Sequence, residues 1–303
     1  KKSYSKMQTN PKIRIGTRGS DLALWQAHFV RRQLEEIGCE VSIQIIVTQG
    51  DRIQDLSFDK LEGKGFFTKE IEQALLNGEV DLAVHSHKDL ETTQPSGLHI
   101  AAVSYREDAS ELLLMRREAF DASQAWNLKA NAVIGTSSAR RKAQIIAQRP
   151  DLAIKELRGN VPTRIDKLRQ GQYDAILLAR AGVLRLELDL SDLETIVLDP
   201  TSFIPAPAQG VLGLQTRVDD VVTTEILQKL HHSDVATRIG LERSVLRQMD
   251  GGCQLPLGVY CVDDQVYVSY SPSSAEAAEN KVYSYVAGQE TALAQEIVQE
   301  LKK

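Results

Sequence analysis

Residues 12–48 read KIRIGTRGSDLALWQAHFVRRQLEEIGCEVSIQIIVT, and this stretch decides the fold class. Residues 12–17 alternate apolar and polar side chains, which predicts a short strand. Ser20 is placed to cap a helix with one apolar face, and Gly38 is placed to end it. Residues 41–48 are rich in β-branched side chains and predict a second strand. A strand, a helix and a strand in this order are typical of a parallel βαβ unit.

The same alternation continues along the chain. Thr68 is placed to cap a helix that stops at Asn77-Gly78 and precedes a buried strand at 80–84. Further strands are predicted at 132–135, 153–157 and 173–179. One helix is predicted to start at Arg140, and a second, after residues 158–160, to end at Arg169. Residues 50–66 carry glycines and charges and predict a mobile loop of lid type. Residues 203–209 (FIPAPAQ) contain two prolines and predict a hinge segment.

The composition changes beyond about residue 224. A helix at 237–249, strands at 258–262 and 265–270, and a last helix at 291–301 predict a small α+β domain. The sequence therefore indicates an α/β chain with parallel βαβ units followed by this smaller domain.

Composition and charge restrict the class of protein. The apolar runs are too short for a membrane helix, and residues 1–12 lack the apolar core of a secretory signal. Three cysteines form an odd, sparse set, which predicts a reducing, cytoplasmic setting. The net charge of −5 argues against nucleic-acid binding. The middle of the chain is nevertheless rich in arginine, which indicates either a solvated basic face or a site for a polyanion.

Chemically useful side chains follow the predicted strands. These groups are Arg18 with Ser20, residues 85–89 (HSHKD), residues 136–141 (TSSARR) and residues 158–160 (RGN). Ligands of open parallel sheets bind beyond the carboxyl ends of the strands. Hydroxyls, helix N-termini and guanidinium groups together suit a carboxylate or a phosphate. Helix capping and surface arginines would explain one such group, but several at strand ends indicate an anion site.

Residues 250–256 (DGGCQLP) present a lone thiol, Cys253, after two glycines. The thiol is either a nucleophile or covalent tether, or a buried, inert side chain in a turn. Asp89 is either a general acid/base of a pocket or a helix cap or surface ion pair. The pattern His85-x-His87-x-Asp89 also suggests a metal, but no other histidine has ligand spacing with it, so we expect none.

Taken together, these motifs closely resemble the porphobilinogen deaminase (hydroxymethylbilane synthase) family from about residue 12 to the end. The segments that carry the resemblance are 15–27, 63–67, 84–89, 135–141, 157–164 and 251–254. The resemblance implies two domains like type II periplasmic binding proteins and a small C-terminal α+β domain. Domain 1 would comprise 1–105 and 206–223, domain 2 residues 106–205, and domain 3 residues 224–303.

The resemblance also implies an activity. Members of the family are transferases of tetrapyrrole (haem) biosynthesis that condense four porphobilinogen molecules, with loss of ammonia, onto a dipyrromethane cofactor. Hydrolysis then releases hydroxymethylbilane. By this resemblance the cofactor forms a thioether with Cys253, and Asp89 is the catalytic carboxylate. A cytoplasmic monomer with porphobilinogen as its small-molecule substrate, and without metal, membrane or nucleic acid, is expected.

Residue by residue, the matching positions fall into two groups. The cofactor-binding group comprises Cys253, Lys88, Asp89, Ser137, Ser138, Arg140, Arg141, Arg158, Asn160, Arg164, Ser86 and Gly252. The substrate-binding group comprises Arg18, Ser20, Lys60, Lys64, Phe67, Arg158, Arg164, Arg185 and Gln209.

The chain departs from the family at two positions near these groups. Glu91 stands where proline is usual, and Ala208 stands where glycine is common. The alternative function is a non-catalytic, two-lobed binding protein for carboxylates or other anions, which would leave Cys253 and Asp89 without a role.

Overall fold

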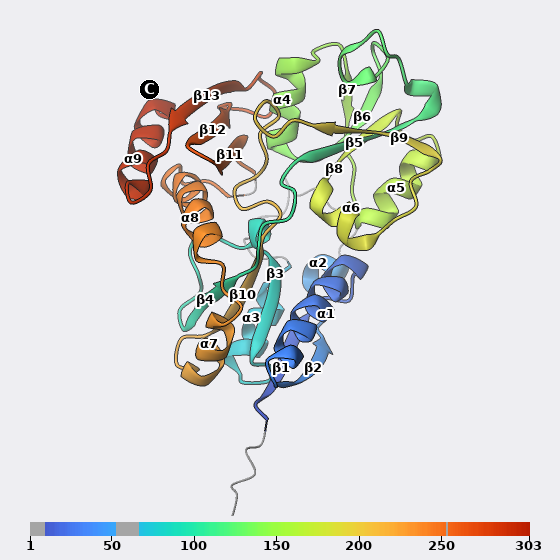
Figure 1. Cartoon of the computed structure of the whole chain (residues 1–303). Coiled ribbons are helices and arrows are strands. Elements are labelled where there is room, and N and C mark those ends of the chain that lie inside the picture. Colours follow the sequence, from blue (N-terminus) through green and yellow to red (C-terminus); the bar gives the residue numbers. More distant parts are fainter. Residues whose placement is uncertain (1–9, 53–66, 253) are drawn as a thin grey trace, which may run out of the picture.

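The structure is a computed structural model that describes residues 10–52, 67–252 and 254–303, and it contains three sheets (Figure 1). The first sheet has the strand order β2-β1-β3-β10-β4. Strands β1 (Lys12–Thr17), β2 (Glu40–Ile45) and β3 (Leu82–Ser86) are parallel. Strand β10 (Leu212–Arg217) runs antiparallel between β3 and β4 (Leu98–Val103).

Helices α1 (Asp21–Glu36), α3 (Lys69–Leu76) and α7 (Val221–Gln228) accompany the first sheet, together with the short α2 (Gln49–Arg52). Helix α1 begins where the sequence predicts, because the Ser20 hydroxyl accepts a hydrogen bond from the Ala23 N–H at 3.4 Å. After β3, the chain forms the 3₁₀ turn η2 (His87–Asp89). Arg18 and η2 thus follow neighbouring parallel strands at the same edge of the sheet.

The second sheet repeats this plan with the order β7-β6-β8-β5-β9. Strands β6 (Val133–Gly135), β7 (Ala153–Lys155) and β8 (Ala175–Ala179) are parallel, and β5 (Glu111–Arg116) is antiparallel to β8 and β9 (Leu193–Leu198). Helices α4 (Ala139–Gln148), α5 (Val161–Arg169) and α6 (Arg180–Leu186) follow the three parallel strands. The third sheet is the antiparallel β11 (Leu257–Val262), β12 (Gln265–Tyr270) and β13 (Glu279–Ser284), with α8 (Ser233–Gln248) and α9 (Glu290–Leu301).

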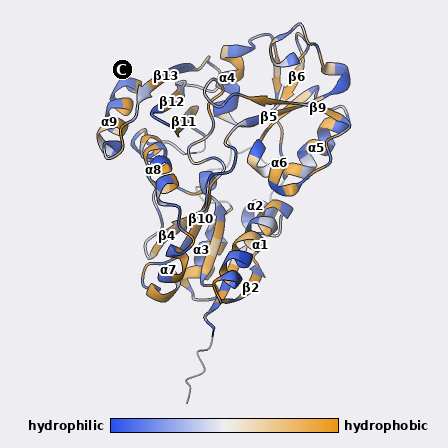
Figure 2. Ribbon diagram, viewed as in Figure 1, coloured by the Kyte–Doolittle hydropathy of each residue, from blue (hydrophilic) through white to orange (hydrophobic). Residues whose placement is uncertain are grey.

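Each sheet has its own hydrophobic core. Apolar side chains of α1 pack on the first sheet, and both faces of the second sheet are covered by buried clusters. Figure 2 shows hydrophobic colour along β5, whose residues Leu113, Leu114 and Met115 are fully buried. A third cluster fills the space between α8, α9 and the third sheet. Burial of apolar surface in these three places stabilises a fold that keeps polar residues at strand ends.

The segment that leaves the second sheet and enters β10 has an unusual backbone. Residues 203–209 form neither helix nor strand, as the two prolines predict. Ala208 is fully buried and has a φ of 64°, in the left-handed region that favours glycine. Glycine would adopt this conformation without the steric cost that a Cβ adds. Gly210 has a φ of 88°, and a Cβ there would lie 2.4 Å from the Glu107 carbonyl oxygen, so this position requires glycine.

The predicted elements correspond closely to the observed ones, with identifiable exceptions. The expected loop at 50–66 is wrong at its start, because residues 49–52 form α2; residues 53–66 lie outside the described residues. The helix predicted at 237–249 begins four residues earlier, as α8. Strands β4, β5, β9, β10 and β13 were not predicted individually, and β10 is the strand that returns the chain to the first sheet. Over the described residues, no helix is both long and apolar enough to cross a membrane.

Candidate functional site

Helix N-termini at the edge of the second sheet carry the predicted hydroxyl and amide groups. The Ser138 hydroxyl accepts from the Arg141 N–H at 3.3 Å and caps α4. Asn160 Oδ1 accepts from the Thr163 N–H at 2.9 Å and caps α5. Ser137 joins the two segments, because its hydroxyl donates to the Leu157 carbonyl at 2.8 Å. Three of the predicted polar residues therefore shape this edge by capping and bridging.

Arg140 and Arg141 are buried and share one carboxylate, that of Glu111 on β5. Arg140 Nη2 donates to Oε1 at 2.6 Å and Arg141 Nη2 donates to Oε2 at 2.7 Å. Burial raises the pKa of Glu111, but the nearby Arg141 and Arg140 outweigh it and lower the pKa to about 2. Glu111 is therefore ionised near neutral pH, and sequence reasoning missed it.

Lys88 faces this buried group from the first sheet. Its ammonium donates to Gln209 Oε1 at 3.3 Å, and Gln209 Nε2 donates to the Ala109 carbonyl at 2.8 Å. Burial lowers the pKa of Lys88 to about 8; Asp89 opposes this effect and Arg141 adds to it. Gln209, at the end of segment 203–209, is fully buried and therefore holds Lys88 in place.

Arg164 extends the cluster from α5. Its Nε donates to the Gly159 carbonyl at 2.7 Å. Burial lowers the pKa of Arg164 to about 10; Arg141 and Arg158 act in the same direction and Asp89 opposes them. These mutual effects connect five cations with two carboxylates: Lys88, Arg140, Arg141, Arg158 and Arg164 with Asp89 and Glu111. The cluster carries an excess of positive charge, and Asp89 is its exposed carboxylate.

Arg18 forms a separate, more exposed group at the end of β1. Its Nε donates to Asp51 Oδ1 at 3.0 Å, and its guanidinium lies 4.3 Å from the centre of the Phe67 ring. Thr48 also binds Asp51, through its N–H at 3.1 Å and its hydroxyl at 2.7 Å. Burial raises the pKa of Asp51, but hydrogen bonds from Arg18 and Thr48 lower it below its usual value. Asp51 is the second partner carboxylate that sequence reasoning missed.

Two further predicted residues occupy structural positions. Arg185, on α6, is buried, donates from Nη2 to the Gly210 carbonyl at 2.9 Å and lies 5.8 Å from the Trp25 ring centre. Ser86 accepts from Gln26 Nε2 at 2.9 Å, which ties the end of β3 to α1. Both contacts connect strand or helix ends next to the cluster.

Two of the three cysteines belong to the described residues. Cys39 and Cys261 are free and buried. Burial raises the pKa of both thiols, that of Cys261 to about 11, so neither is a ready nucleophile. Cys253 lies outside the described residues, as do Lys60 and Lys64, and Gly252 immediately before Cys253 is exposed.

The histidine motif has a structural use. His85 Nε2 lies 2.9 Å from Gln215 Oε1 in a buried contact between β3 and β10. His87 packs over Gly213, where a Cβ would lie 3.3 Å from its ring. Within the described ranges, no three His, Cys, Asp or Glu side chains are grouped to hold a metal ion. Glu91 contributes its backbone carbonyl, which accepts from Arg243 Nη2 of α8 at 2.9 Å.

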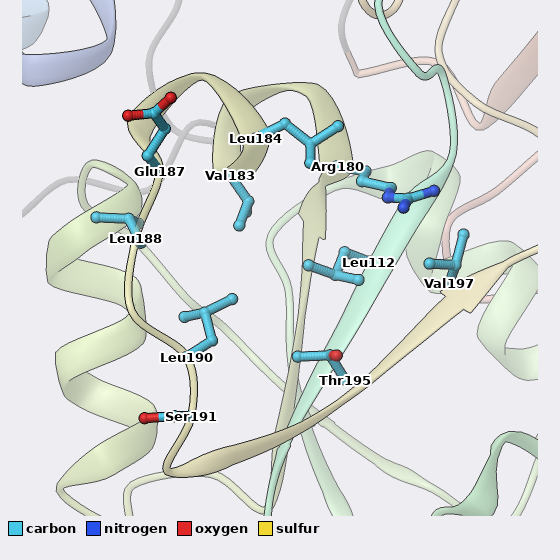
Figure 3. A pocket seen from close by; sticks show the side chains of 10 residues that line it. All are labelled: Leu112, Arg180, Val183, Leu184, Glu187, Leu188, Leu190, Ser191, Thr195 and Val197. Atoms are coloured by element: carbon cyan, nitrogen blue, oxygen red, sulfur yellow. The ribbon is translucent and has the colours of Figure 1, made fainter.

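A pocket of about 580 Å³ lies elsewhere, between α6, β5 and β9 (Figure 3). Leucine and valine side chains line most of it, with Arg180 and Glu187 among the polar residues. Arg180 is paired with Asp108 at 2.6 Å. None of the site residues predicted from the sequence is among the described residues that line this pocket.

Comparisons with known proteins decide the family. A family model described as "Porphobilinogen deaminase, dipyromethane cofactor binding domain" matches residues 13–225. A second model, "Porphobilinogen deaminase, C-terminal domain", matches residues 236–303. The chain belongs to the porphobilinogen deaminase family.

Curated relatives of the porphobilinogen deaminase family agree. The porphobilinogen deaminase of Shouchella clausii (strain KSM-K16) is 47% identical over 251 residues, covering 82% of this chain and 79% of the relative. That of Maridesulfovibrio salexigens is 46% identical over 251 residues, covering 82% and 80%. Among solved structures, the periplasmic VFT2 domain of Bordetella pertussis BvgS is similar with a TM-score of 0.45 and 13% identity, over 77% of this chain and 94% of that one.

The cluster of five cations with Asp89 and Glu111 fits a dipyrromethane group. Such a group carries two carboxylates on each ring, and the cluster offers an excess of cations at the edges of both sheets. No described residue accepts a hydrogen bond from the buried Arg141 Nε, so this N–H remains for a ligand. Guanidinium groups pair well with carboxylates, and buried charges require such partners.

Proposed function

We propose that this protein is a porphobilinogen deaminase. It condenses four porphobilinogen molecules onto a dipyrromethane cofactor, releasing ammonia, and then hydrolyses the bond to the cofactor to release hydroxymethylbilane. The observation that carries the proposal is the cluster of five cations that interact with one another and with Asp89 and Glu111, within a chain of net charge −5. When bound, the dipyrromethane supplies the free pyrrole carbon to which substrate is added. Family membership supports the same reaction.

Each group of side chains has a distinct role in this proposal. Arg140, Arg141, Arg158, Arg164 and Lys88 bind cofactor carboxylates, with Ser86, Ser137, Ser138, Asn160 and Gly252 shaping the surrounding backbone and helix ends. Arg18, with Phe67 below its guanidinium, binds a carboxylate of porphobilinogen. Ser20, Arg185, Gln209, Lys60 and Lys64 belong to the same substrate-binding group as Arg18. Ser20, Arg185 and Gln209 also hold the neighbouring elements in place.

Asp89 is the proposed catalytic carboxylate. It is exposed, directly follows Lys88 in η2 and interacts electrostatically with Arg164. A carboxylate here can hold a pyrrole N–H, assist transfer of a proton to departing ammonia and stabilise the cation that develops on the substrate.

Cys253 is the proposed attachment point. Cys39 and Cys261 are buried thiols with raised pKa values, and Cys253 follows the exposed Gly252. A division into three domains (1–105 with 206–223, 106–205, and 224–303) is part of the proposal, and the return of β10 to the first sheet supports it. The sparse cysteines support a cytoplasmic location. We also propose a monomer that needs no metal or nucleic acid.

The test is the intact mass of the denatured protein, followed by peptide mapping. We expect an excess of two pyrrole units on the peptide that contains Cys253. Incubation with porphobilinogen should then add further pyrrole units and release hydroxymethylbilane. A chain that carries no pyrrole and gains none from porphobilinogen would contradict the proposal and favour the anion-binding alternative.

A further inference from the structure

Glu111 connects the two arginines that the proposed function assigns to the cofactor. It enters from β5, whereas Arg140 and Arg141 come from α4, and each carboxylate oxygen accepts from a different arginine. Its side chain is 0% exposed, and those of the arginines are 7% and 8% exposed. The three charges therefore interact away from bulk water. In such buried surroundings an uncompensated charge is costly.

The other guanidinium nitrogens show which contacts remain for a ligand. Arg140 Nη1 donates to the Ile204 carbonyl at 2.9 Å, and Arg141 Nη1 donates to the Leu177 carbonyl at 3.1 Å. Each guanidinium is thus held at two points, by Glu111 and by a backbone carbonyl. Arg141 Nε is buried and has no acceptor among the described residues. The pair is oriented, and the Arg141 Nε–H is a buried donor without an acceptor among the described residues.

We propose that Glu111 is a positioning residue for cofactor assembly: it orients Arg140 and Arg141 and balances their charge until the dipyrromethane carboxylates arrive. This inference rests on the proposed function and names the device that prepares the same site. Among the described residues, Glu111 is the carboxylate that binds both Arg140 and Arg141, while Asp89 interacts with Lys88 and Arg164 and Glu156 with Arg158. With cofactor, additional carboxylates share that task.

A thermodynamic consequence follows. Removing the charge of Glu111 should destabilise the cofactor-free chain more than the loaded chain, because only the loaded chain has other carboxylates to balance the arginines. A purely structural role would give the same loss in both forms. The difference between the two losses therefore measures the proposed role directly and does not depend on turnover.

Glu242 supplies a matched control. It is also fully buried and binds an arginine, with Arg106 Nη1 donating to Oε1 at 2.6 Å, but its other contacts are the N–H groups of Ala208 and Cys261. Glu242→Gln removes a buried carboxylate of the same type from another ion pair. We expect it to destabilise the loaded and cofactor-free chains equally.

The experiment compares wild type, Glu111→Gln and Glu242→Gln, each prepared cofactor-free and loaded with porphobilinogen, with loading checked by mass. Urea unfolding should show that Glu111→Gln changes the unfolding equilibrium constant at least tenfold more in the cofactor-free form. It should also load at least tenfold more slowly than wild type. Equal losses in both forms together with wild-type loading would overturn the inference.

Glu111→Asp covers the case in which Glu111→Gln does not fold. It keeps the charge but shortens the side chain by one methylene, so it cannot reach both arginines in the same way. We expect a folded chain that loads several-fold more slowly than wild type; wild-type loading would overturn the positioning role. If wild type itself acquires no pyrrole, the proposed function has failed rather than this inference.

Discussion

The two arginine groups of the site are built differently. Arg140 and Arg141 keep only 7% and 8% of their side chains exposed and share the fully buried Glu111. Arg18 keeps 28% exposed and pairs with Asp51, which keeps 24% exposed. Breaking a buried pair by removing one partner typically costs about 3–5 kcal/mol, whereas an exposed pair contributes roughly 0.2–1 kcal/mol. The buried group is therefore fixed, and the half-buried pair of Arg18 and Asp51, which water reaches, exchanges its partner more readily.

This contrast matches two chemical tasks. A covalent cofactor is bound once and stays, so its carboxylates suit arginines that are held at several points. Substrate carboxylates must arrive and leave in every cycle, which suits an arginine whose protein partner is displaced at low cost. We therefore assign assembly to the buried group and substrate exchange to the half-buried Arg18 group, and the variants below test this division.

The largest effect is expected at Asp89, which lies next to Lys88 in η2 and interacts with Arg164 of the cation cluster. Asp89→Asn should fold and load cofactor but lose roughly 10²- to 10⁴-fold in turnover, because it removes the group that handles the proton and the developing cation. Release of hydroxymethylbilane under saturating porphobilinogen is the measurement. Turnover close to wild type would remove the catalytic role of Asp89.

Arg141→Leu should act on assembly. The variant removes the guanidinium that binds Glu111 and the Leu177 carbonyl, and we expect cofactor loading to fall below about 1% of wild type. Mass spectrometry of the purified chain measures the loaded fraction. Arg149→Leu is the control: Arg149 is equally buried but binds Asp151 and backbone carbonyls, so this change should lower stability and leave loading intact. Full loading of Arg141→Leu would contradict the assignment.

Arg18→Leu should act on substrate and leave loading unchanged. The loss of one charge-assisted contact of about 1.5–3 kcal/mol raises KM by roughly 10- to 150-fold. Arg14→Leu is the matched control: Arg14 lies on β1, the strand that Arg18 directly follows, and pairs with Asp81 at 2.8 Å, away from the site. Steady-state rates and the loaded fraction are both measured. If Arg18→Leu instead failed to load, the two arginine groups would share one task.

Lys88 makes loading dependent on pH. Its pKa of about 8 means that the ammonium loses its proton above pH 8, so we expect loading of cofactor-free chain to fall up to tenfold per pH unit. Stability should change in the opposite direction. The pKa in the folded chain lies below the ordinary 10.5, so the free energy of unfolding rises between about pH 8 and 10. Lys88→Arg, which stays charged, should load cofactor without this fall at high pH. If its loading followed the same pH profile as wild type, Lys88 would be excluded as the origin of the pH dependence.

Much of this site was predictable from the sequence, because its residues follow strands or cap helices. Ser20, Ser138 and Asn160 cap the helices that the pattern predicts, and this local chemistry depends on neighbours three residues away. The partner carboxylates were not predictable in the same way. Glu111 meets Arg140 across 29 residues and Asp51 meets Arg18 across 33, and such meetings are set by strand order.

The two missed carboxylates had weak signals of different kinds. Glu111 opens an apolar run, ELLLMR, and an acidic residue there has the appearance of an exposed strand end. It is buried because β5 lies between β8 and β9 in the sheet, although both of these strands come later in the sequence. Asp51 was assigned to a loop, whereas it lies in α2 and is anchored by Thr48. In both cases the tertiary pairing, not the local pattern, determines the role.

The smallest effect, and the most informative in its sign, is expected for Asp51→Asn. Asp51 occupies the guanidinium that a porphobilinogen carboxylate would bind, so the two compete for Arg18. Weakening this half-buried pair should lower KM by about 1.5- to 5-fold with little change in loading or stability. If Asp51 instead orients Arg18 as Glu111 orients Arg140 and Arg141, KM should rise. A rise would show that both arginine groups are prepared by a protein carboxylate and that burial alone does not separate their tasks.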